Sequence, residues 1–287
     1  MRQAIAFCPG HITGFFQICR HPDMLQTGSR GGGFSITLGA ESRVVLKDGD
    51  GQVDVHINGA RVKAIVTEAA VRNVLGDERC DVDVYTLLQL PVSQGFGMSA
   101  AGALSSALAL SELLGRGEDD AYEAAHRAEV QCGTGLGDVA ALRTGGIEFR
   151  RKEGLQPFGE VERIPGDFDM LLAKVGPMID TSTIILDPVR SEAINKAGSD
   201  AYQRFSRSPG LHELLDVSMD FTRSSGLITG HVEKALRSVG AENIGGMCMV
   251  GNSIFAAGGD IMELGRKLSK YGNVYEASVD LEGPRLI

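Results

Sequence analysis

The sequence predicts an α+β fold divided into two domains. Its 287 residues exceed the size of a minimal single core, so one large or two ordinary domains are expected. Segments with strand-like alternation of apolar and polar residues are interspersed with segments of helical spacing. A polar stretch with two prolines, residues 152–166, separates the two halves. We therefore predict one domain at residues 1–160 and a second at residues 161–287.

Composition and charge exclude several classes of protein. The hydrophobic share of 43% and the charged share of 23% are typical of globular chains and exclude a disordered or low-complexity protein. The net charge of −9 argues against a broad basic surface for nucleic acid. No apolar run is long enough to cross a bilayer, and the first residues are typical of a strand rather than of a signal sequence. We expect a cytoplasmic protein with neither a nucleic acid nor a membrane as partner.

The N-terminal half is predicted to combine an antiparallel sheet with helices. Strand patterns occupy residues 2–8, 34–38, 43–46, 52–57, 81–90 and 147–151, and helical patterns occupy residues 62–74, 98–114 and 119–130. Residues 10–33 are polar and rich in glycine, which predicts a long loop, either functional or a disordered insertion. The turn at residues 48–51 is expected to join its two flanking strands in a hairpin.

The C-terminal half shows few strand patterns among several helical ones. Strands are predicted at residues 168–175 and 274–279 and as a pair within residues 247–257, and helices at residues 200–205, 211–224, 229–239 and 261–271. This order predicts an α+β second domain.

A glycine-rich turn precedes the most apolar of the predicted helices. Residues 91–101 read PVSQGFGMSAA, and Gly95 and Gly97 permit close backbone approach and a positive φ. The free N–H groups at the start of the helix face an anion, and Ser99 adds a hydroxyl. The pattern predicts a phosphate-binding turn; the alternative is a tight turn that packs a small-residue helix under a sheet.

Other nucleotide-binding motifs fit this turn less well. Gly95, Gly97 and Ala100 also match the dinucleotide pattern G-x-G-x-x-A, but the second strand that this fold needs is replaced by a helical pattern. No lysine followed by serine or threonine comes after the glycines, which excludes a Walker A loop. The signatures of protein kinases are absent as well.

Three segments, in order, resemble the motifs of the GHMP small-molecule kinases. Residues 91–101 resemble the second motif, P-x-x-x-G-L-G-S-S-A-A, and residues 6–10 (AFCPG) resemble the first. Residues 133–138 (GTGLGD) resemble the region that carries the catalytic aspartate of the family. The resemblance implies a two-domain fold, with a first half like domain 2 of ribosomal protein S5 and a ferredoxin-like second half. The chain departs from the family at Met98, where a serine is usual, and in its third motif, which is eroded at residues 245–253.

The resemblance implies an enzyme that transfers phosphate from ATP with Mg²⁺. The residues implied for the ATP phosphates are Pro91, Ser93, Gly95, Phe96, Gly97, Met98, Ser99, Ala100 and Ala101. Ser99 and Glu129 are implied as Mg²⁺ ligands, and Asp138 as the group that orients or deprotonates the attacking hydroxyl. From the residues alone, Glu129 also fits a solvated helix position, and Asp138 also fits a helix N-cap.

Residues 8–16, 28–33 and 250–256 are most similar to the archaeal branch of this superfamily that phosphorylates the 4-hydroxyl of pantoate in coenzyme A biosynthesis. A small hydroxy acid of this kind needs a cation for its carboxylate, and arginine suits that role. Arg30 is the first candidate, although a glycine-rich loop also suits an exposed arginine. The full set implied for substrate binding is His11, Arg20, His21, Asp23, Ser29, Arg30, Arg143 and Thr181. Thr181 fits a helix N-cap equally well.

Two other functions stay open at this point. The first is a GHMP kinase for another alcohol, such as homoserine, shikimate or a mevalonate-like compound; His11 argues against the last, because mevalonate kinases carry a lysine there. The second is a non-catalytic nucleotide-binding protein, against which the presence of both Glu129 and Asp138 argues. A homodimer is compatible with the sequence, which does not fix the number of copies.

Overall fold

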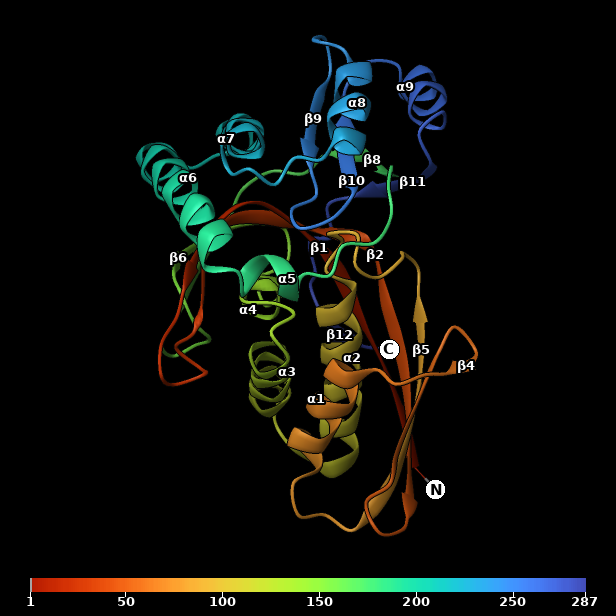
Figure 1. Cartoon of the computed structure of the whole chain (residues 1–287). Helices are drawn as coiled ribbons and strands as arrows, with labels where there is room; N and C mark the ends of the chain where they lie inside the picture. The colour runs from red at the N-terminus through yellow and green to blue at the C-terminus, as the bar shows by residue number, and fades with distance from the viewer. Residues whose placement is uncertain (1) are drawn as a thin grey trace.

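The computed structural model describes residues 2–287 as two β-sheets with helices packed on them (Figure 1). The strands of the large sheet are β1 (Arg2–Cys19), β2 (Gly28–Asp48), β3 (Val53–Ile57), β4 (Ala60–Arg61), β5 (Cys80–Leu88), β6 (Ile147–Lys152), β7 (Glu160–Ile164) and β12 (Arg285–Leu286). The strands of the small sheet are β8 (Asp169–Lys174), β9 (Ile244–Met247), β10 (Ser253–Ala257) and β11 (Asn273–Ser278). The predicted α+β class is confirmed.

The helices lie in three groups along the chain. The first group is α1 (Ile65–Leu75), α2 (Met98–Leu114), α3 (Glu118–Cys132) and α4 (Asp138–Leu142). The second group is α5 (Ser182–Ile185), α6 (Pro188–Arg207) and α7 (Leu211–Ser224). The third group is α8 (Gly230–Val239) and α9 (Ile261–Leu268). Among these helices of residues 2–287, none combines the length and the apolar character needed to cross a bilayer.

The large sheet is built on a long antiparallel hairpin of β1 and β2. The pairing register shifts between Pro9 and Gly10 and again between Thr13 and Phe15, and bulges of this kind bend a strand. The first half of β1 pairs with the end of β2, whereas its second half pairs with the start of β2, which also pairs with β6. Because of this bend, one part of the hairpin packs against the helices, and another part lies near the small sheet (Figure 1).

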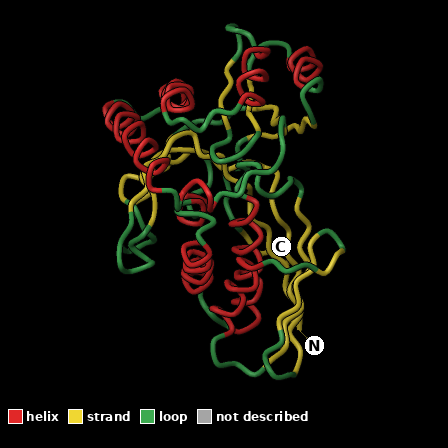
Figure 2. Tube along the Cα trace, in the orientation of Figure 1, coloured by secondary structure: helices red, strands yellow, loops and turns green. Residues whose placement is uncertain are grey.

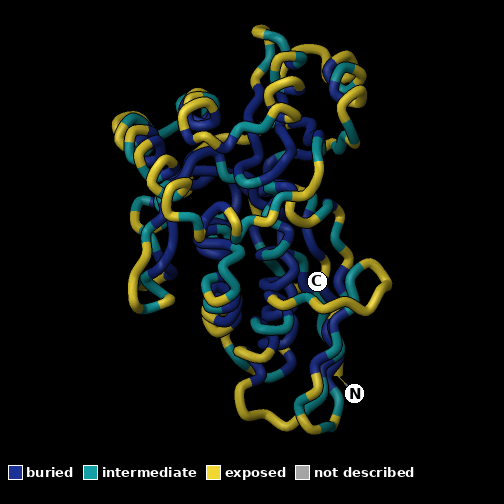
Figure 3. Tube along the Cα trace, viewed as in Figure 1, coloured by how far each residue is buried: buried dark blue, intermediate teal, exposed yellow. Residues whose placement is uncertain are grey.

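Helices α1, α2 and α3 pack against one another, and α2 covers β1 and β2 (Figure 2). Helix α2 has the predicted bounds, and its small apolar residues are buried on nearly every side. Its Ser105 and Ser106 hydroxyls both lie within hydrogen-bond distance of the Ser42 hydroxyl on β2, at 2.7 and 3.1 Å. The buried residues are concentrated where these helices meet the sheet (Figure 3). This packing fixes the N-terminal end of α2, which matters for the site below.

The small sheet has the order β11-β8-β10-β9 with every neighbouring pair antiparallel. When these strands are numbered 1 to 4 along the chain, their order in the sheet is 4-1-3-2, which is the strand order of a ferredoxin-like unit. Helices α8 and α9 pack on this sheet, and α6 and α7 pack on β1 of the large sheet. An isolated bridge between Ile36 and Val279 links the two sheets. The predicted boundary between residues 160 and 161 stays a prediction.

The predicted loop at residues 10–33 is wrong, because most of it belongs to β1 and β2. Gly31, Gly32 and Gly33 pair with β1 on one side and with β6 on the other. A Cβ on Gly33 would overlap the carbonyl oxygen of Ile12. The glycines therefore serve close strand packing rather than a turn, and composition alone does not separate these two uses.

The predicted hairpin around residues 48–51 is wrong as well, because β5 lies between β2 and β3. Strand β3 runs parallel to β5, and β5 runs antiparallel to β2. The Asp81 carboxylate accepts hydrogen bonds from the backbone N–H groups of Asp50 and Gln52, at 3.0 and 2.8 Å. This side chain ties the connection to the start of β5, which the local turn pattern did not indicate.

In the C-terminal half, α7 has the predicted bounds, whereas α6 begins at Pro188, twelve residues before the predicted start. The Asp187 carboxylate caps α6 by accepting from the N–H groups of Val189 and Arg190. Proline at the first helical position is a start signal that the prediction overlooked. The predicted pair within residues 247–257 is confirmed in part: β10 lies inside this range and pairs with β9, but β9 begins at Ile244 and only its last residue falls within the range.

We predict that Gly33→Ala lowers the free energy of unfolding by about 1–3 kcal/mol, because its Cβ has no room between β1 and β2. The matched control is Gly230→Ala at the exposed start of α8, where no atom lies within 4 Å of the new Cβ. This control leaves stability unchanged or raises it by up to about 1 kcal/mol. Urea denaturation of both variants measures the difference, and equal effects would contradict the packing argument.

Candidate active site

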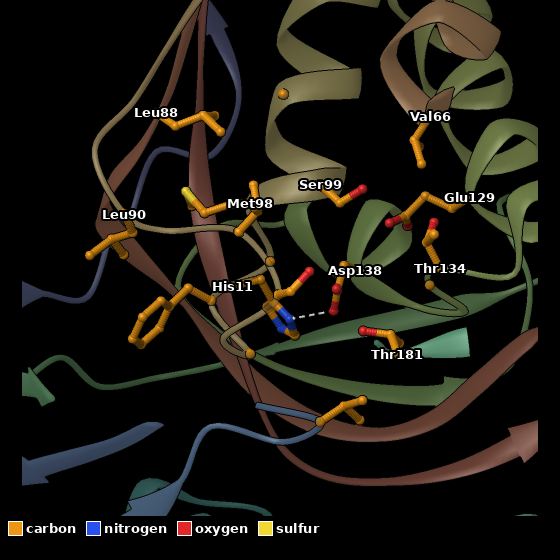
Figure 4. A pocket seen from close by; sticks show the side chains of 18 of the residues that line it. His11, Val66, Leu88, Leu90, Met98, Ser99, Glu129, Thr134, Asp138 and Thr181 are labelled. Carbon is orange, nitrogen blue, oxygen red and sulfur yellow. Dashed lines mark hydrogen bonds and ion pairs between the residues drawn. The ribbon is translucent and has the colours of Figure 1, made fainter. Parts of the chain in front are cut away.

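One cavity of about 740 Å³ opens between the start of α2, the end of α3 and the turns that lead to α4 and α5 (Figure 4). Strand β1 contributes His11 and Thr13 to its wall, and the connection between β9 and β10 contributes Met249 and Val250. Its volume lies within the range of ordinary ligand sites, about 300–1,000 Å³. The cavity thus collects residues from distant parts of the sequence.

The glycine-rich turn before α2 forms one wall of this cavity. Gly97 is the N-cap of α2 with φ at +67°, and a Cβ there would lie 2.8 Å from the backbone nitrogen of His11. The same nitrogen donates a hydrogen bond to the carbonyl oxygen of Phe96, at 3.1 Å. Ala101 N donates to Gly97 O, which leaves the three preceding N–H groups of α2 without a partner inside the helix. Free N–H groups at a helix start can bind an anion, so the anion site predicted from the sequence has donors here and stays a prediction.

Glu129 lies on α3 and points toward Ser99 in the cavity (Figure 4). It is only 2% exposed, which excludes the alternative of a solvated helix residue. Burial and repulsion by Asp138 raise its pKa well above the ordinary value, although the Val139 N–H partly offsets them. A Cβ on Gly135 would lie 2.5 Å from the Glu129 carboxylate, so the turn approaches this side chain closely. Within residues 2–287, Glu129 forms no ion pair.

Asp138 is the first residue of α4, and its side chain is 29% exposed to the cavity. The N-cap of α4 is Gly137, so Asp138 does not serve as the cap. Its Oδ1 instead lies 2.9 Å from Nδ1 of the buried His11. Burial raises the pKa of this carboxyl, but the hydrogen bond and charge of His11 and the charge of Arg150 outweigh it and lower the pKa. Asp138 and Glu129 therefore favour opposite protonation states in one cavity.

The structure brings most of the residues predicted for the site together. Those that line the cavity are His11, Ser29, Pro91, Ser93, Gly95, Phe96, Gly97, Met98, Ser99, Glu129, Asp138 and Thr181. Ala100 and Ala101 are fully buried behind the turn, so only the N–H of Ala100 is available there. Thr181 is the N-cap of α5 but makes no capping hydrogen bond with its side chain.

The structure does not bring the other predicted substrate residues to the cavity wall. Arg30 donates to the Glu153 carboxylate at 2.6 Å, and Arg20 donates to Ile185 O at 2.6 Å. Arg143 pairs with Asp119 on the outside of α3. His21 and Asp23 form a local turn in which the Asp23 N–H donates to His21 Nδ1, at 3.1 Å. Their predicted role in substrate binding stays a prediction.

Sequence analysis missed three groups at or beneath the cavity. Lys174 on β8 lines the cavity and forms no ion pair among the described residues. Glu148 and Arg150 on β6 are buried below His11, and both are paired. The sequence of β6, IEFRRK, alternates apolar and charged residues, which predicts that Glu148 and Arg150 face solvent, so it held no local signal of their burial.

The eroded third motif forms the connection between β9 and β10, which closes one side of the cavity. Val250 has φ at +61°, which a β-branched residue rarely adopts. A Cβ on Gly251 would overlap the backbone of Gln94, and the Ser253 hydroxyl donates to Gln94 O. The motif therefore packs directly against the glycine-rich turn before α2 even though its own glycine pattern is reduced.

A free helix N-terminus can bind phosphate, and a carboxylate in the same cavity can orient or deprotonate an attacking hydroxyl, so the site has parts that phosphoryl transfer to a small molecule requires. Residues 61–146 match the family described as GHMP kinases N terminal domain. A protein of Methanocaldococcus jannaschii named "Pantoate kinase" is 34% identical over 255 residues, which cover 87% of this chain and 90% of that relative. The chain belongs to the GHMP kinases.

Two further comparisons agree with this placement. A "Pantoate kinase" of Thermococcus kodakarensis is 32% identical over 88% of this chain and 86% of that relative. A solved structure described as "Phosphotransferase related to CoA biosynthesis pathway" superposes with a TM-score of 0.90 at 28% identity, and it covers 100% of this chain and 99% of its own. The predicted two-domain GHMP-kinase fold is confirmed.

We predict that Glu129→Gln removes part of the pH dependence of stability in protein freed of metal by a chelator. Because the folded pKa of Glu129 is raised, its contribution is full below its ordinary value of 4.5 and is lost as the pH rises through the folded pKa. The free energy of unfolding of the wild type should fall more between about pH 5 and about pH 8 than that of the variant. Urea denaturation at both pH values measures this, with Glu112→Gln on exposed α2 surface as control. Equal pH dependence in all three proteins would contradict the burial of an unpaired carboxyl.

Proposed function

We propose that this chain is an ATP-dependent kinase that phosphorylates the 4-hydroxyl of (R)-pantoate to 4-phosphopantoate, a step of coenzyme A biosynthesis. The observation that carries the proposal is the cavity in which an ionised Asp138 and a buried Glu129 face the free N-terminus of α2. The substrate is inferred from the relatives, whose similarity extends over most of the chain.

The phosphates of ATP fit the N-terminal end of α2. Free N–H groups there, together with the positive end of the helix dipole, favour a negatively charged group. Gly95 and Gly97 both adopt a positive φ, which keeps side-chain atoms away from the approaching phosphates. Ser99, in the first turn, adds a hydroxyl on the cavity side. We propose that this turn, from Pro91 to Ser99, holds the phosphates.

Glu129 and Ser99 fit a Mg²⁺ ion. A buried carboxylate with no cationic partner among the described residues is costly by itself, and a divalent cation would compensate its charge. Carboxylate and hydroxyl oxygens are the hard ligands that Mg²⁺ prefers. When bound, the ion supplies charge neutralisation to the phosphates of the nucleotide.

Asp138 is placed to receive the proton of the attacking hydroxyl. Its pKa is lowered, so it is ionised at neutral pH and accepts a hydrogen bond from the substrate O–H. As the new O–P bond forms, the proton moves to Asp138 and the bond between the γ-phosphorus and its bridging oxygen breaks. The electron pair of that bond stays with ADP, so atoms and charges balance.

The carboxylate of the substrate needs a cation, and two cations that were not predicted from the sequence are candidates. Lys174 lines the cavity. Arg150 is buried and does not line it, but its Nε and one terminal nitrogen have no hydrogen-bond partner among the described residues. Ser29 and Thr181 add polar side chains to the cavity wall, whereas both ring nitrogens of His11 are already bonded to carboxylates. We propose that this wall binds pantoate, with Arg30 as a candidate that would have to leave Glu153.

The division into domains at residues 160 and 161, a cytoplasmic location and a homodimer remain proposals from the sequence. Lys174, Thr181 and Val250 come from the second proposed domain and line the cavity with residues of the first. On this division, substrate and nucleotide would bind between the two domains.

The decisive experiment is a substrate panel. Purified protein with Mg-ATP is given pantoate, homoserine, shikimate or mevalonate, and ADP formation is followed with mass detection of the phosphorylated product. We expect a dominant pantoate signal. A different preferred alcohol would contradict the proposed substrate but retain the kinase activity, and no ADP with any of them would contradict the proposed function.

We predict that Asp138→Asn lowers kcat with pantoate by at least about 100-fold, the scale of general acid–base catalysis. The amide keeps the volume of the side chain and still accepts a hydrogen bond from His11, so the fold and the affinity for ATP should change little. Asp77→Asn, at an exposed position after α1, is the matched control and should retain full activity. A kcat near that of the wild type in Asp138→Asn would contradict the assigned role.

A further inference from the structure

A row of four charged side chains runs from the interior of the large sheet to the cavity. Arg150, Glu148 and His11 are each no more than 1% exposed, whereas the Asp138 side chain is 29% exposed to the cavity. Glu148 and Arg150 are two residues apart on β6, so they point to the same side of the sheet. The row therefore connects a buried ion pair to the proposed catalytic carboxylate.

The contacts along this row are direct. His11 Nδ1 lies 2.9 Å from Asp138 Oδ1, and His11 Nε2 lies 3.2 Å from Glu148 Oε1. Arg150 donates to the same Oε1 atom of Glu148. The imidazole ring is thus held at both nitrogens, one by each carboxylate.

This geometry sets the protonation of His11. An ionised carboxylate only accepts hydrogen bonds, so a ring with a carboxylate at each nitrogen donates from both and is positively charged. Burial opposes that charge, but the hydrogen bonds and charges of Asp138 and Glu148 outweigh it, so the pKa of His11 is raised. Positive and negative groups then alternate along the whole row.

The buried ion pair is poorly explained as a stabilising feature of the sheet. Oε2 of Glu148 and two nitrogens of Arg150 have no hydrogen-bond partner among the described residues. Burying such partly satisfied charges costs free energy, and apolar side chains of similar volume pack at least as well. Glu148 contacts the same His11 ring that binds Asp138, and this contact offers a functional reason for a buried carboxylate at position 148.

We propose that Glu148 is a positioning residue for phosphoryl transfer, which acts by holding the His11 ring so that its Nδ1–H is aimed at Asp138. The fixed Nδ1–H binds Oδ1 of Asp138 and leaves the other carboxylate oxygen for the substrate hydroxyl. Glu148 does not line the cavity and touches neither substrate nor nucleotide in this arrangement. The inference rests on the proposed function, because it concerns the same reaction.

The first test is Glu148→Gln, which keeps the volume but removes the charge. We expect kcat with pantoate to fall by about 10- to 100-fold, by analogy with the loss measured when a partner that orients a metal-ligating side chain is removed. KM for pantoate and for ATP should stay nearly unchanged. Glu162→Gln on β7 is the matched control, because Glu162 is half exposed and pairs with Arg151 away from the row. A raised KM for pantoate with an unchanged kcat would overturn the proposal, because Glu148 would then act on substrate binding through Arg150.

A double-mutant cycle separates positioning from general structural damage. If Glu148 acts through His11, Glu148→Gln should lower kcat little further in a His11→Gln background. If the decreases in kcat of the two single variants multiply in the double variant, the proposal is overturned. Should Glu148→Gln fail to fold, Glu148→Asp keeps the charge at a shorter reach and should give a smaller fall in kcat with the same non-additivity.

A readout that needs no substrate completes the test. In protein labelled with ¹⁵N-histidine, the signals of His11 are assigned by their loss in His11→Gln. We expect both ring nitrogens to carry a proton in the wild type at neutral pH, and Nε2 to lose it in Glu148→Gln. Unchanged His11 signals in that variant would overturn the inference. If the signals change as expected but the wild type does not phosphorylate pantoate, the proposed function is contradicted. The orientation of His11 by Glu148 would still be supported.

Discussion

The site depends on the close approach of strand β1 to the turn before α2. The backbone N–H of His11 donates to Phe96 O across this contact, and Gly97 leaves the space that it requires. The approach places the His11 ring beside the N-terminus of α2, so Asp138, which binds that ring, lies next to the proposed anion site. A side chain at position 97 would separate the proposed phosphate-binding turn from the proposed catalytic carboxylate.

The electrostatics of the cavity follow from how its carboxylates are surrounded. Asp138 receives a hydrogen bond from a charged imidazole and feels the charge of Arg150, so it is held ionised. Glu129 has no cationic partner of this kind among the described residues. Burial beside Asp138 raises its pKa, so the neutral form is favoured when no cation is bound to it. Two acidic groups on the successive helices α3 and α4 thus acquire different properties, one suited to accepting a proton and the other to holding a metal ion.

The bend of the β1–β2 hairpin brings these groups together. Its two register shifts direct the second half of β1 toward β6, so that His11 reaches Glu148 although 137 residues separate them. The glycines of β2 permit β1 and β6 to pack closely on either side. The long hairpin is therefore a structural requirement of the site as well as the centre of the large sheet.

Local signals predicted a large part of this arrangement. The positive-φ glycines and the bounds of α2 follow from small residues and helix-start rules, and they are observed at the predicted positions. Residues 10–33 were misassigned because glycine serves both turns and tight strand pairs. Glu148, Arg150 and Lys174 were missed because their significance comes from pairing with distant strands, which a single sequence does not specify. Arg30 was predicted to bind the substrate carboxylate because its ion pair with Glu153, which lies 123 residues away, was not visible in the sequence.

A crystal structure of the protein with pantoate, Mg²⁺ and a non-hydrolysable ATP analogue tests the proposed site most directly. We expect the phosphates at the N-terminus of α2, the ion between Ser99 and Glu129, and the 4-hydroxyl of pantoate within about 3 Å of the Asp138 carboxylate. Pantoate bound with its 4-hydroxyl away from Asp138, or a nucleotide bound outside this cavity, would contradict the proposed site.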